Sequence, residues 1–248
     1  MLFCAPPAVA DDGEDCVKES GDIAIAACDR AIASGRYGAL NLAVLYNNRG
    51  VEYKNKGQPD RAIQDYDQAI RLNPQYAAPF NNRGNAYDKK GQLDRAIQDY
   101  DQAIRINPQD AKAFYNRGDT YDKKGQHDRA IQDYDQAIRL NPQDAAAFDN
   151  RGVAYWTKGQ YDRAIQDYDQ AIRLDPQDAE AFYNRGLAYE SKGQHDRAIQ
   201  DYDQAIRLNP QYAAAFVHRG LAKKAKGDTA DGDADIAKAR QLQLGIGQ

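Results

Sequence analysis

Apolar residues recur along the chain in two alternating patterns, and each has the spacing of an α-helix. One pattern is Ala, Ile, Tyr, Ala and Ile at intervals of one or three residues, as in the segment 130–138. The other is an aromatic residue, a glycine and a tyrosine at intervals of four and three residues, as in the segment 114–121. Glycine in "KGQ" follows one pattern and proline in "NP" follows the other, where helices commonly end. The chain therefore predicts helix pairs and no sheet.

The pair of patterns returns every 34 residues, which indicates stacked repeats rather than independent domains. Counted from Ala43 as position 1, the full repeats are 43–76, 77–110, 111–144, 145–178 and 179–212, and a degenerate sixth begins at 213. Glycine stands at position 8 in all six, at 50, 84, 118, 152, 186 and 220. A glycine costs about 1 kcal/mol inside a helix relative to alanine, so its return predicts a close contact between helices.

These residues resemble the tetratricopeptide repeat. Its signature has an aromatic at position 4, Gly at 8, Tyr at 11, Ala at 20, an aromatic at 24, Ala at 27 and Pro at 32, and all five full repeats match every position. The third repeat shows the match with Phe114, Gly118, Tyr121, Ala130, Tyr134, Ala137 and Pro142. The resemblance implies an all-α, right-handed superhelical solenoid of antiparallel helix pairs. It also implies a concave groove, lined by the first helices, that binds peptides or partner proteins.

One departure from that family concerns position 7, where the family usually has Leu and this chain has Arg in all six repeats. The full repeats also carry Asp at position 23, in the opposite helix. Because buried charges have to be paired, we expect a ladder of Arg–Asp pairs between helices. The second carboxylate of each "DYD" is expected to pair four residues along its own helix, as Asp67 with Arg71.

Both ends of the chain differ from the repeats, as a finite stack requires. Residues 11–42 predict a divergent N-terminal helix pair, and residues 213–248 a degenerate sixth repeat with a capping helix. Residues 1–10, "MLFCAPPAVA", resemble the tail of a signal peptide, which indicates export, with the periplasm as the expected compartment and the cytoplasm as the alternative. An exported chain would keep one pair of cysteines, Cys16 and Cys28, at positions that pack together in the family. We expect a disulfide between them.

Composition, charge and the absence of certain motifs indicate which classes of function are not expected. The net charge of -4 and the pI near 5.4 lack the basic footprint of a nucleic-acid-binding protein, and no apolar run is long enough to span a membrane. No nucleophile elbow, phosphate-binding loop, dinucleotide fingerprint or zinc-protease motif occurs, so neither an enzyme nor a cofactor or metal site is expected.

Variation within the repeats is concentrated in the first helix. Positions 18–29 are identical in the five full repeats, whereas positions 2, 5, 9, 12 and 13, here called the groove stripe, vary most and share one helix face. Asn occupies position 6 beside the stripe in repeats one to five, and a column of amides suits hydrogen bonding to an extended backbone. The predicted peptide-binding residues are Asn47, Asn48, Asn81, Asn82, Asn85, Asp88, Lys112, Tyr115, Asn116, Asp119, Asp122, Asp149, Asn150, Trp156, Glu180, Tyr183, Asn184 and Glu190.

These side chains predict a non-enzymatic interaction scaffold. Aromatic anchors within acidic surroundings favour a protein or peptide ligand that carries Lys or Arg beside an apolar residue. Two alternatives remain: a structural module that self-associates through the ends of the solenoid, and carbohydrate binding on Tyr115, Trp156 and Tyr183. The clamp by which some members of the family hold acidic chaperone tails is only partly present, in Asn82 and Lys112, so that ligand is not expected.

Overall fold

The computed structural model describes residues 12–243, and all regular structure in that range is helical. The fourteen helices are α1 (Asp12–Lys18), α2 (Gly21–Ala33), α3 (Ala39–Asn55), α4 (Pro59–Leu72), α5 (Ala77–Lys89), α6 (Leu93–Ile106), α7 (Ala111–Lys123), α8 (His127–Leu140), α9 (Ala145–Thr157), α10 (Tyr161–Leu174), α11 (Ala179–Ser191), α12 (His195–Leu208), α13 (Ala213–Ala225) and α14 (Thr229–Gln243). The all-α prediction is confirmed. None of the described helices is long and apolar enough to cross a membrane.

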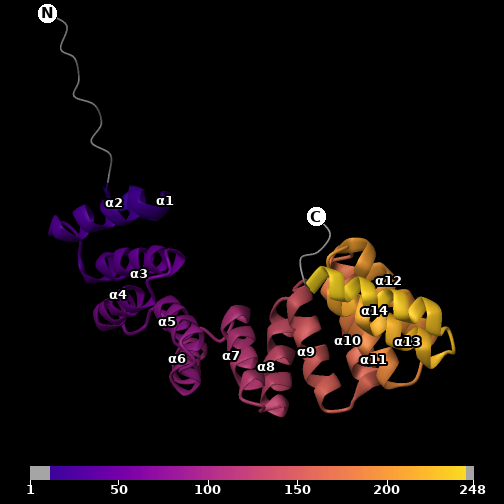
Figure 1. Ribbon diagram of the computed structural model, residues 1–248. Helices are drawn as coiled ribbons and strands as arrows, with labels where there is room; N and C mark the ends of the chain where they lie inside the picture. The colour runs from indigo at the N-terminus through magenta and orange to yellow at the C-terminus, as the bar shows by residue number, and fades with distance from the viewer. Residues whose placement is uncertain (1–11, 244–248) are drawn as a thin grey trace, which may run out of the picture. The chain divides into compact units, whose positions relative to one another are not determined.

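Internal contacts divide the chain into two compact units, one up to Thr120 and one from Tyr121. In the first unit, α1 packs on α2, α3 on α4 and α5 on α6; in the second, α9 packs on α10, α11 on α12 and α13 on α14 (Figure 1). Successive first helices also touch, α1 with α3 and α3 with α5 in one unit, and α9 with α11 and α11 with α13 in the other. Each unit therefore has a continuous face made of first helices.

Glycine at position 8 lets the two helices of a repeat approach closely. A Cβ added at Gly84 would lie 2.7 Å from Cε1 of Tyr100, and one added at Gly152 would lie 2.7 Å from Cε1 of Tyr168. These tyrosines, at position 24, are 1% exposed. The aromatic ring thus packs directly on the backbone of the facing helix, which accounts for the glycine.

Glycine at position 15 makes the turn between the two helices. Gly57 and Gly159 have φ angles of 70° and 71°, in the left-handed region that a residue with a Cβ rarely adopts. The first helix ends there, and the second begins two residues later. The predicted helix boundary is confirmed.

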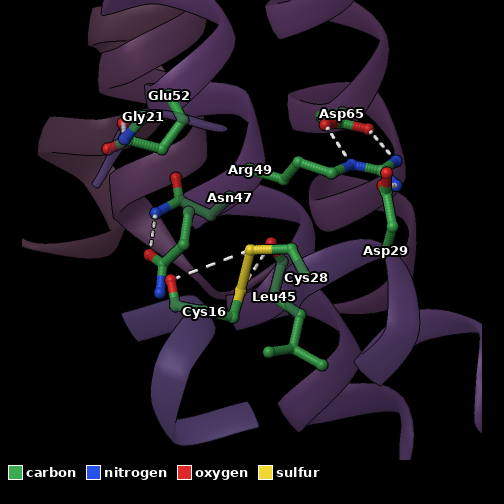
Figure 2. Close-up of a disulfide and its surroundings, with 10 residues drawn as sticks. Cys16, Gly21, Cys28, Asp29, Leu45, Asn47, Arg49, Glu52 and Asp65 are labelled. Carbon is green, nitrogen blue, oxygen red and sulfur yellow. Dashed lines mark hydrogen bonds and ion pairs between the residues drawn. A yellow bond between two sulfur atoms is a disulfide. The ribbon is translucent and has the colours of Figure 1, made fainter. Parts of the chain in front are cut away.

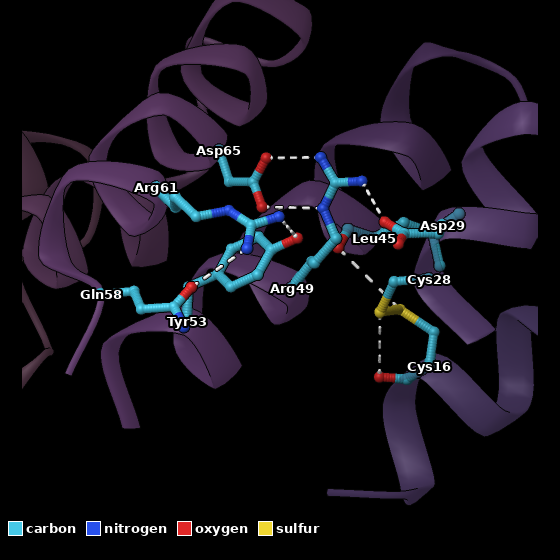
Figure 3. Close-up of polar contacts among 9 residues, drawn as sticks. All are labelled: Cys16, Cys28, Asp29, Leu45, Arg49, Tyr53, Gln58, Arg61 and Asp65. Atoms are coloured by element: carbon cyan, nitrogen blue, oxygen red, sulfur yellow. Dashed lines mark hydrogen bonds and ion pairs between the residues drawn. A yellow bond between two sulfur atoms is a disulfide. The ribbon is translucent and has the colours of Figure 1, made fainter. Parts of the chain in front are cut away.

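Arginine at position 7 joins three helices. Arg83 donates from Nε and Nη2 to the two carboxylate oxygens of Asp99 in its own repeat, at 2.8 and 2.6 Å, and from Nη1 to Asp67 of the preceding repeat at 2.5 Å. Figure 3 shows the corresponding arrangement of Arg49 between Asp65 and Asp29. The arginines that make the same three bonds are Arg49, Arg83, Arg151, Arg185 and Arg219.

The predicted Arg–Asp ladder is therefore confirmed within repeats, and the structure shows a further Arg–Asp pair between successive repeats. The expected pairing of Asp67 with Arg71 is wrong, because Asp67 accepts from Arg83 instead. Position 25 lies beside the first helix of the next repeat, where a guanidinium group already held by Asp99 presents its remaining nitrogen to it.

The N-terminal helix pair is closed by the two cysteines. Their sulfur atoms lie 2.04 Å apart and their Cα atoms 4.7 Å apart, within the reach of a disulfide, and both side chains are buried (Figure 2). Three polar contacts fasten the pair to α3 and its C-cap. The backbone N–H of Gly21 donates to Glu52 at 2.7 Å, Arg49 donates to Asp29 at 2.6 Å, and Lys56 donates to Asp22. The predicted signal remnant, residues 1–10, lies outside the described residues.

Candidate functional site

The groove stripe lies on the first helices, as the sequence predicts, but it is only partly exposed. Positions 2 and 13 are mostly open to solvent, whereas positions 9 and 12 are largely half-buried. At position 5, Asn47 and Asp149 are 5% and 9% exposed. The stripe therefore contacts the stack as well as solvent.

Position 5 bonds to position 6 of the next repeat. Asn82 donates its amide to Asn47 Oδ1 at 2.9 Å, and Asn116 donates to Asn81 Oδ1 at 3.0 Å. In the second unit, Asn184 donates to both carboxylate oxygens of Asp149 at 3.2 Å. Part of the hydrogen-bonding capacity of these asparagines is therefore used by neighbouring repeats. Binding of a ligand backbone by their remaining donors and acceptors stays a prediction.

In the second and fifth full repeats, a residue at position 9 or 12 accepts a hydrogen bond from the buried tyrosine at position 24. The hydroxyl of Tyr100 donates to Asn85 Oδ1 at 2.7 Å, and that of Tyr202 donates to Glu190 Oε2 at 2.6 Å. The same oxygen of Glu190 lies 3.0 Å from Nδ1 of His218. Burial works to raise the pKa of Glu190, but the hydrogen bonds from His218 and Tyr202 outweigh it and lower that pKa. The first repeat differs, since the buried hydroxyl of Tyr66 has no hydrogen-bond partner.

Two of the predicted aromatic anchors lie in the second unit. Trp156 is half-buried and packs against the buried cluster of Ala164, Tyr168 and Ala188. Its Nε1 donates to Ser191 Oγ of the next repeat at 3.1 Å. Tyr183 packs with its ring centroid 4.9 Å from that of Tyr212 and 5.7 Å from that of His218. Trp156 thus bridges neighbouring repeats while part of its indole stays exposed. Tyr115, the third anchor, is half-buried on α7.

Asp149 is an acid of the stripe whose pKa is raised by burial. Burial, the largest effect, raises its pKa to about 7; the hydrogen bond from Asn184 works in the opposite direction, and the charges of Asp178 and Glu180 add to the rise. Among residues 12–243, no group of three or more His, Cys, Asp or Glu side chains is arranged to hold a metal ion. The acids of the second unit therefore form a negatively charged face without the arrangement of a metal centre.

Comparison with known families identifies the repeat. Models described as tetratricopeptide repeat match residues 43–76, 65–98, 115–179 and 150–213, and one described as TPR repeat matches residues 84–125. The chain belongs to the tetratricopeptide repeat family. Proteins of this family are typically protein–protein interaction modules and are generally not catalytic. No curated protein matches the sequence significantly.

Solved structures of tetratricopeptide repeat proteins share the fold. YrrB, described as a TPR protein with an unusual peptide-binding site, is 27% identical with a TM-score of 0.65, and the match covers 79% of this chain and 97% of that one. MamA is 29% identical with a TM-score of 0.62, over 65% of this chain and 95% of its own. PilF from Pseudomonas aeruginosa, at 17% identity, shares the fold with a TM-score of 0.71, over 83% and 93% of the two chains.

The sequence did not point to two residues that shape the site, Tyr212 and His218, which pack against Tyr183. A signal for Tyr212 existed, because position 34 is Tyr in the first and fifth full repeats and Asp in the three between them. Position 34 immediately precedes the first helix of the next repeat, and from there Tyr212 reaches Tyr183 on the groove stripe of its own repeat.

Proposed function

We propose that this tetratricopeptide repeat chain is a non-enzymatic scaffold that binds an extended peptide or a partner's helix along the groove stripe. The observation that carries the proposal is Trp156, a large aromatic side chain that stays partly exposed on the face of first helices, between acidic neighbours. Aromatic residues of this kind supply much of the binding energy at protein interfaces. The relative YrrB is described with a peptide-binding site in the same fold.

The fixed positions of the repeat have structural tasks, which separates them from the stripe. Asp at position 25 binds the arginine of the next repeat, and Asp at position 18 binds a lysine there, as Asp60 does with Lys90. Arginine at position 19 covers the tyrosine at position 11, with the guanidinium of Arg95 lying 3.9 Å from the ring centroid of Tyr87. Stacking thus accounts for most of the identity of the second helices. Within the stripe, positions 2 and 13 are mostly open to solvent, and this supports the assignment of the stripe to a ligand.

The test compares two variants that add the same charge on different faces. Trp156→Lys places on α9 the residue that the first and sixth repeats carry at position 12, so the stack accommodates it. Gln166→Lys changes an exposed side chain on α10, away from the stripe. Proteins captured from the native source by the unmodified chain are identified, and their affinities for both variants are measured.

We expect Trp156→Lys to weaken binding by at least about 2 kcal/mol, the size of an interface hot spot, and Gln166→Lys to leave it unchanged. Helical content is followed by circular dichroism at a temperature well below the melting of both variants, because Trp156 also packs on the next repeat. Equal binding by the two variants would refute the assignment of the stripe.

We further propose that the protein is exported and works in an oxidising compartment. Support comes from the buried Cys16–Cys28 disulfide, since such bonds persist outside the reducing cytosol. Cells are quenched in acid and free thiols are labelled with a maleimide polymer before gel separation. An unshifted band for the Cys4→Ser variant in the periplasmic fraction is expected, and a doubly labelled cytosolic band would reject export.

A further inference from the structure

Asp149 differs from five other buried aspartates in what it contacts. Five buried aspartates receive two N–H groups each from an arginine: Asp65, Asp99, Asp167, Asp201 and Asp235. Asp149 is 9% exposed, and both its oxygens face the neutral amide of Asn184. Within the described part of the chain no lysine or arginine pairs with it. A buried carboxylate is costly without a counter-charge, so this position has a specific need for a cation.

The surroundings of Asp149 add negative charge and aromatic surface. Asp178, at the N-terminal cap of α11, and Glu180, in its first turn, are close enough to act on Asp149 electrostatically. The phenol of Tyr212 is under the combined influence of Asp149, Asp178 and Glu180, and its ring packs on Tyr183. An acidic site beside two packed aromatic rings, tilted by 43° to each other, is suited to a guanidinium or ammonium group, which gains from both the charge and the ring faces.

We propose that Asp149 is the anchor for a lysine or, better, an arginine side chain of the partner bound in the groove. Arginine fits best because its planar group can donate to two carboxylate oxygens at once while it stacks on an aromatic ring. This inference rests on the proposed function and specifies the chemistry of one subsite.

Trp156 supplies the neighbouring subsite. It follows Asp149 by seven residues on α9, two helical turns away on the same face, which corresponds to about 10 Å along the helix axis. In a polyproline II segment, residues three apart point in the same direction and lie about 9 Å apart. A segment with Arg at one position and an apolar residue three positions later therefore matches both subsites.

Binding of a cationic side chain at this subsite is coupled to the release of a proton from Asp149. Below a pH of about 7, Asp149 of the free protein binds a proton that a cationic ligand must displace to solvent, while the arginine keeps its own. Affinity should thus rise as the pH rises through 7. The other titratable groups that face this site are Asp178 and Glu180 of α11, Tyr168 of α10, Tyr183 of α11 and Tyr212 before α13. His218 of α13 lies 3.0 Å from Glu190, and His195 at the start of α12 acts on Glu190 electrostatically.

The experiment uses two synthetic probes, acetyl-Arg-Pro-Pro-Leu-amide and its citrulline counterpart, which has nearly the same shape and no charge. Trp156 is the only tryptophan of the chain, so its fluorescence reports binding directly, and calorimetry gives an independent affinity. Between about pH 5.5 and pH 8, the affinity for the arginine probe should rise by about 30-fold if Asp149 alone controls it through a pKa near 7.

The matched variant is Asp149→Asn. It recreates with Asn184 the asparagine pair that Asn47 and Asn82 form in the first unit, so the fold should be kept. In this variant we expect the pH dependence to shrink to about twofold or less and the preference for arginine over citrulline to disappear. His218→Gln changes a polar side chain that packs on Tyr183, and this variant should preserve both effects.

Equal binding of the two probes at about pH 8, an unchanged pH profile in Asp149→Asn, or no measurable binding of the arginine probe would each overturn the assignment of Asp149. These results are separable from the proposed function, which depends on whether Trp156→Lys loses the partners captured by the intact chain. If those partners are lost with Trp156→Lys and kept with Asp149→Asn, the groove binds ligands and the cation subsite is wrong.

Discussion

Removal of one arginine from the Arg–Asp ladder should show that its two carboxylate partners contribute unequally to stability. Arg185 holds Asp201 with two N–H groups at 2.8 and 2.6 Å and Asp169 of the preceding repeat with one at 2.6 Å. The Asp201 side chain is 6% exposed and the Asp169 side chain 45% exposed. Burial opposes the charge of Arg185, but the bonds to Asp201 and Asp169 outweigh it and raise the arginine's pKa, so it stays protonated at every accessible pH.

Arg185→Met leaves the carboxylate of Asp201 buried without a cation, a change that costs about 3–5 kcal/mol in other buried pairs. Asp169→Ala removes a solvent-screened partner and should cost no more than about 1 kcal/mol. The double variant Arg185→Met, Asp201→Leu replaces both buried charges with apolar groups and should return to within about 1 kcal/mol of the unmodified chain. Arg185→Met is therefore expected to lower the free energy of unfolding most, and the other two variants should lower it far less.

The assay is urea unfolding combined with hydrogen exchange. Contacts in a repeat stack are confined to neighbours, so a local defect can open one interface before the rest. Exchange in α10 to α12 should accelerate in Arg185→Met and stay close to normal in the other two variants. If Asp169→Ala destabilises the chain as much as Arg185→Met does, or if the double variant is no better than the single one, the ladder is not held by burial of its inner carboxylate.

Three further changes test the packing. Val51→Asn should give the unpartnered hydroxyl of Tyr66 an acceptor and raise stability by about 1 kcal/mol in urea unfolding, and no gain would mean that this hydroxyl is satisfied by water. Gly152→Ala should cost about 1–3 kcal/mol despite the better helix propensity of alanine, because its Cβ would lie 2.7 Å from the ring of Tyr168; a rise in melting temperature would contradict this close contact. Cys28→Ser should destabilise α1 and α2 by about 3 kcal/mol, seen as faster proteolysis of this pair alone, and unchanged proteolysis would show that the disulfide adds nothing.

Much of the fold could be predicted because the local signals repeat. Helical spacing, the glycines at positions 8 and 15 and the charge pair at positions 7 and 23 each report on contacts inside one repeat, which sequence periodicity describes well. The partner of Asp67 could not be predicted in this way. It depends on where the next first helix lies, and a pairing within the helix looked equally suitable from the sequence.

The candidate site was predicted less well, for a related reason. Helix periodicity placed Asp149 and Trp156 on the first helix of one repeat, and both lie on that helix, α9. It could not show that the face of one repeat is partly covered by the next, so the bond between Asn184 and Asp149 and the contact of Trp156 with Ser191 were not foreseen. Burial of a stripe residue depends on contacts between two successive repeats, which the periodicity of one helix does not describe.

The bridging arginine also bears on how such a chain can change its length. Each arginine reaches back to position 25 of whichever repeat comes before it, and that position is Asp in every full repeat. Loss or duplication of one 34-residue block would leave every junction with the same three partners. Gene copying can therefore lengthen or shorten the groove in whole steps without a new interface having to evolve, while the capping helix α14 stops the series by carrying Ala237 where the next arginine would need a carboxylate.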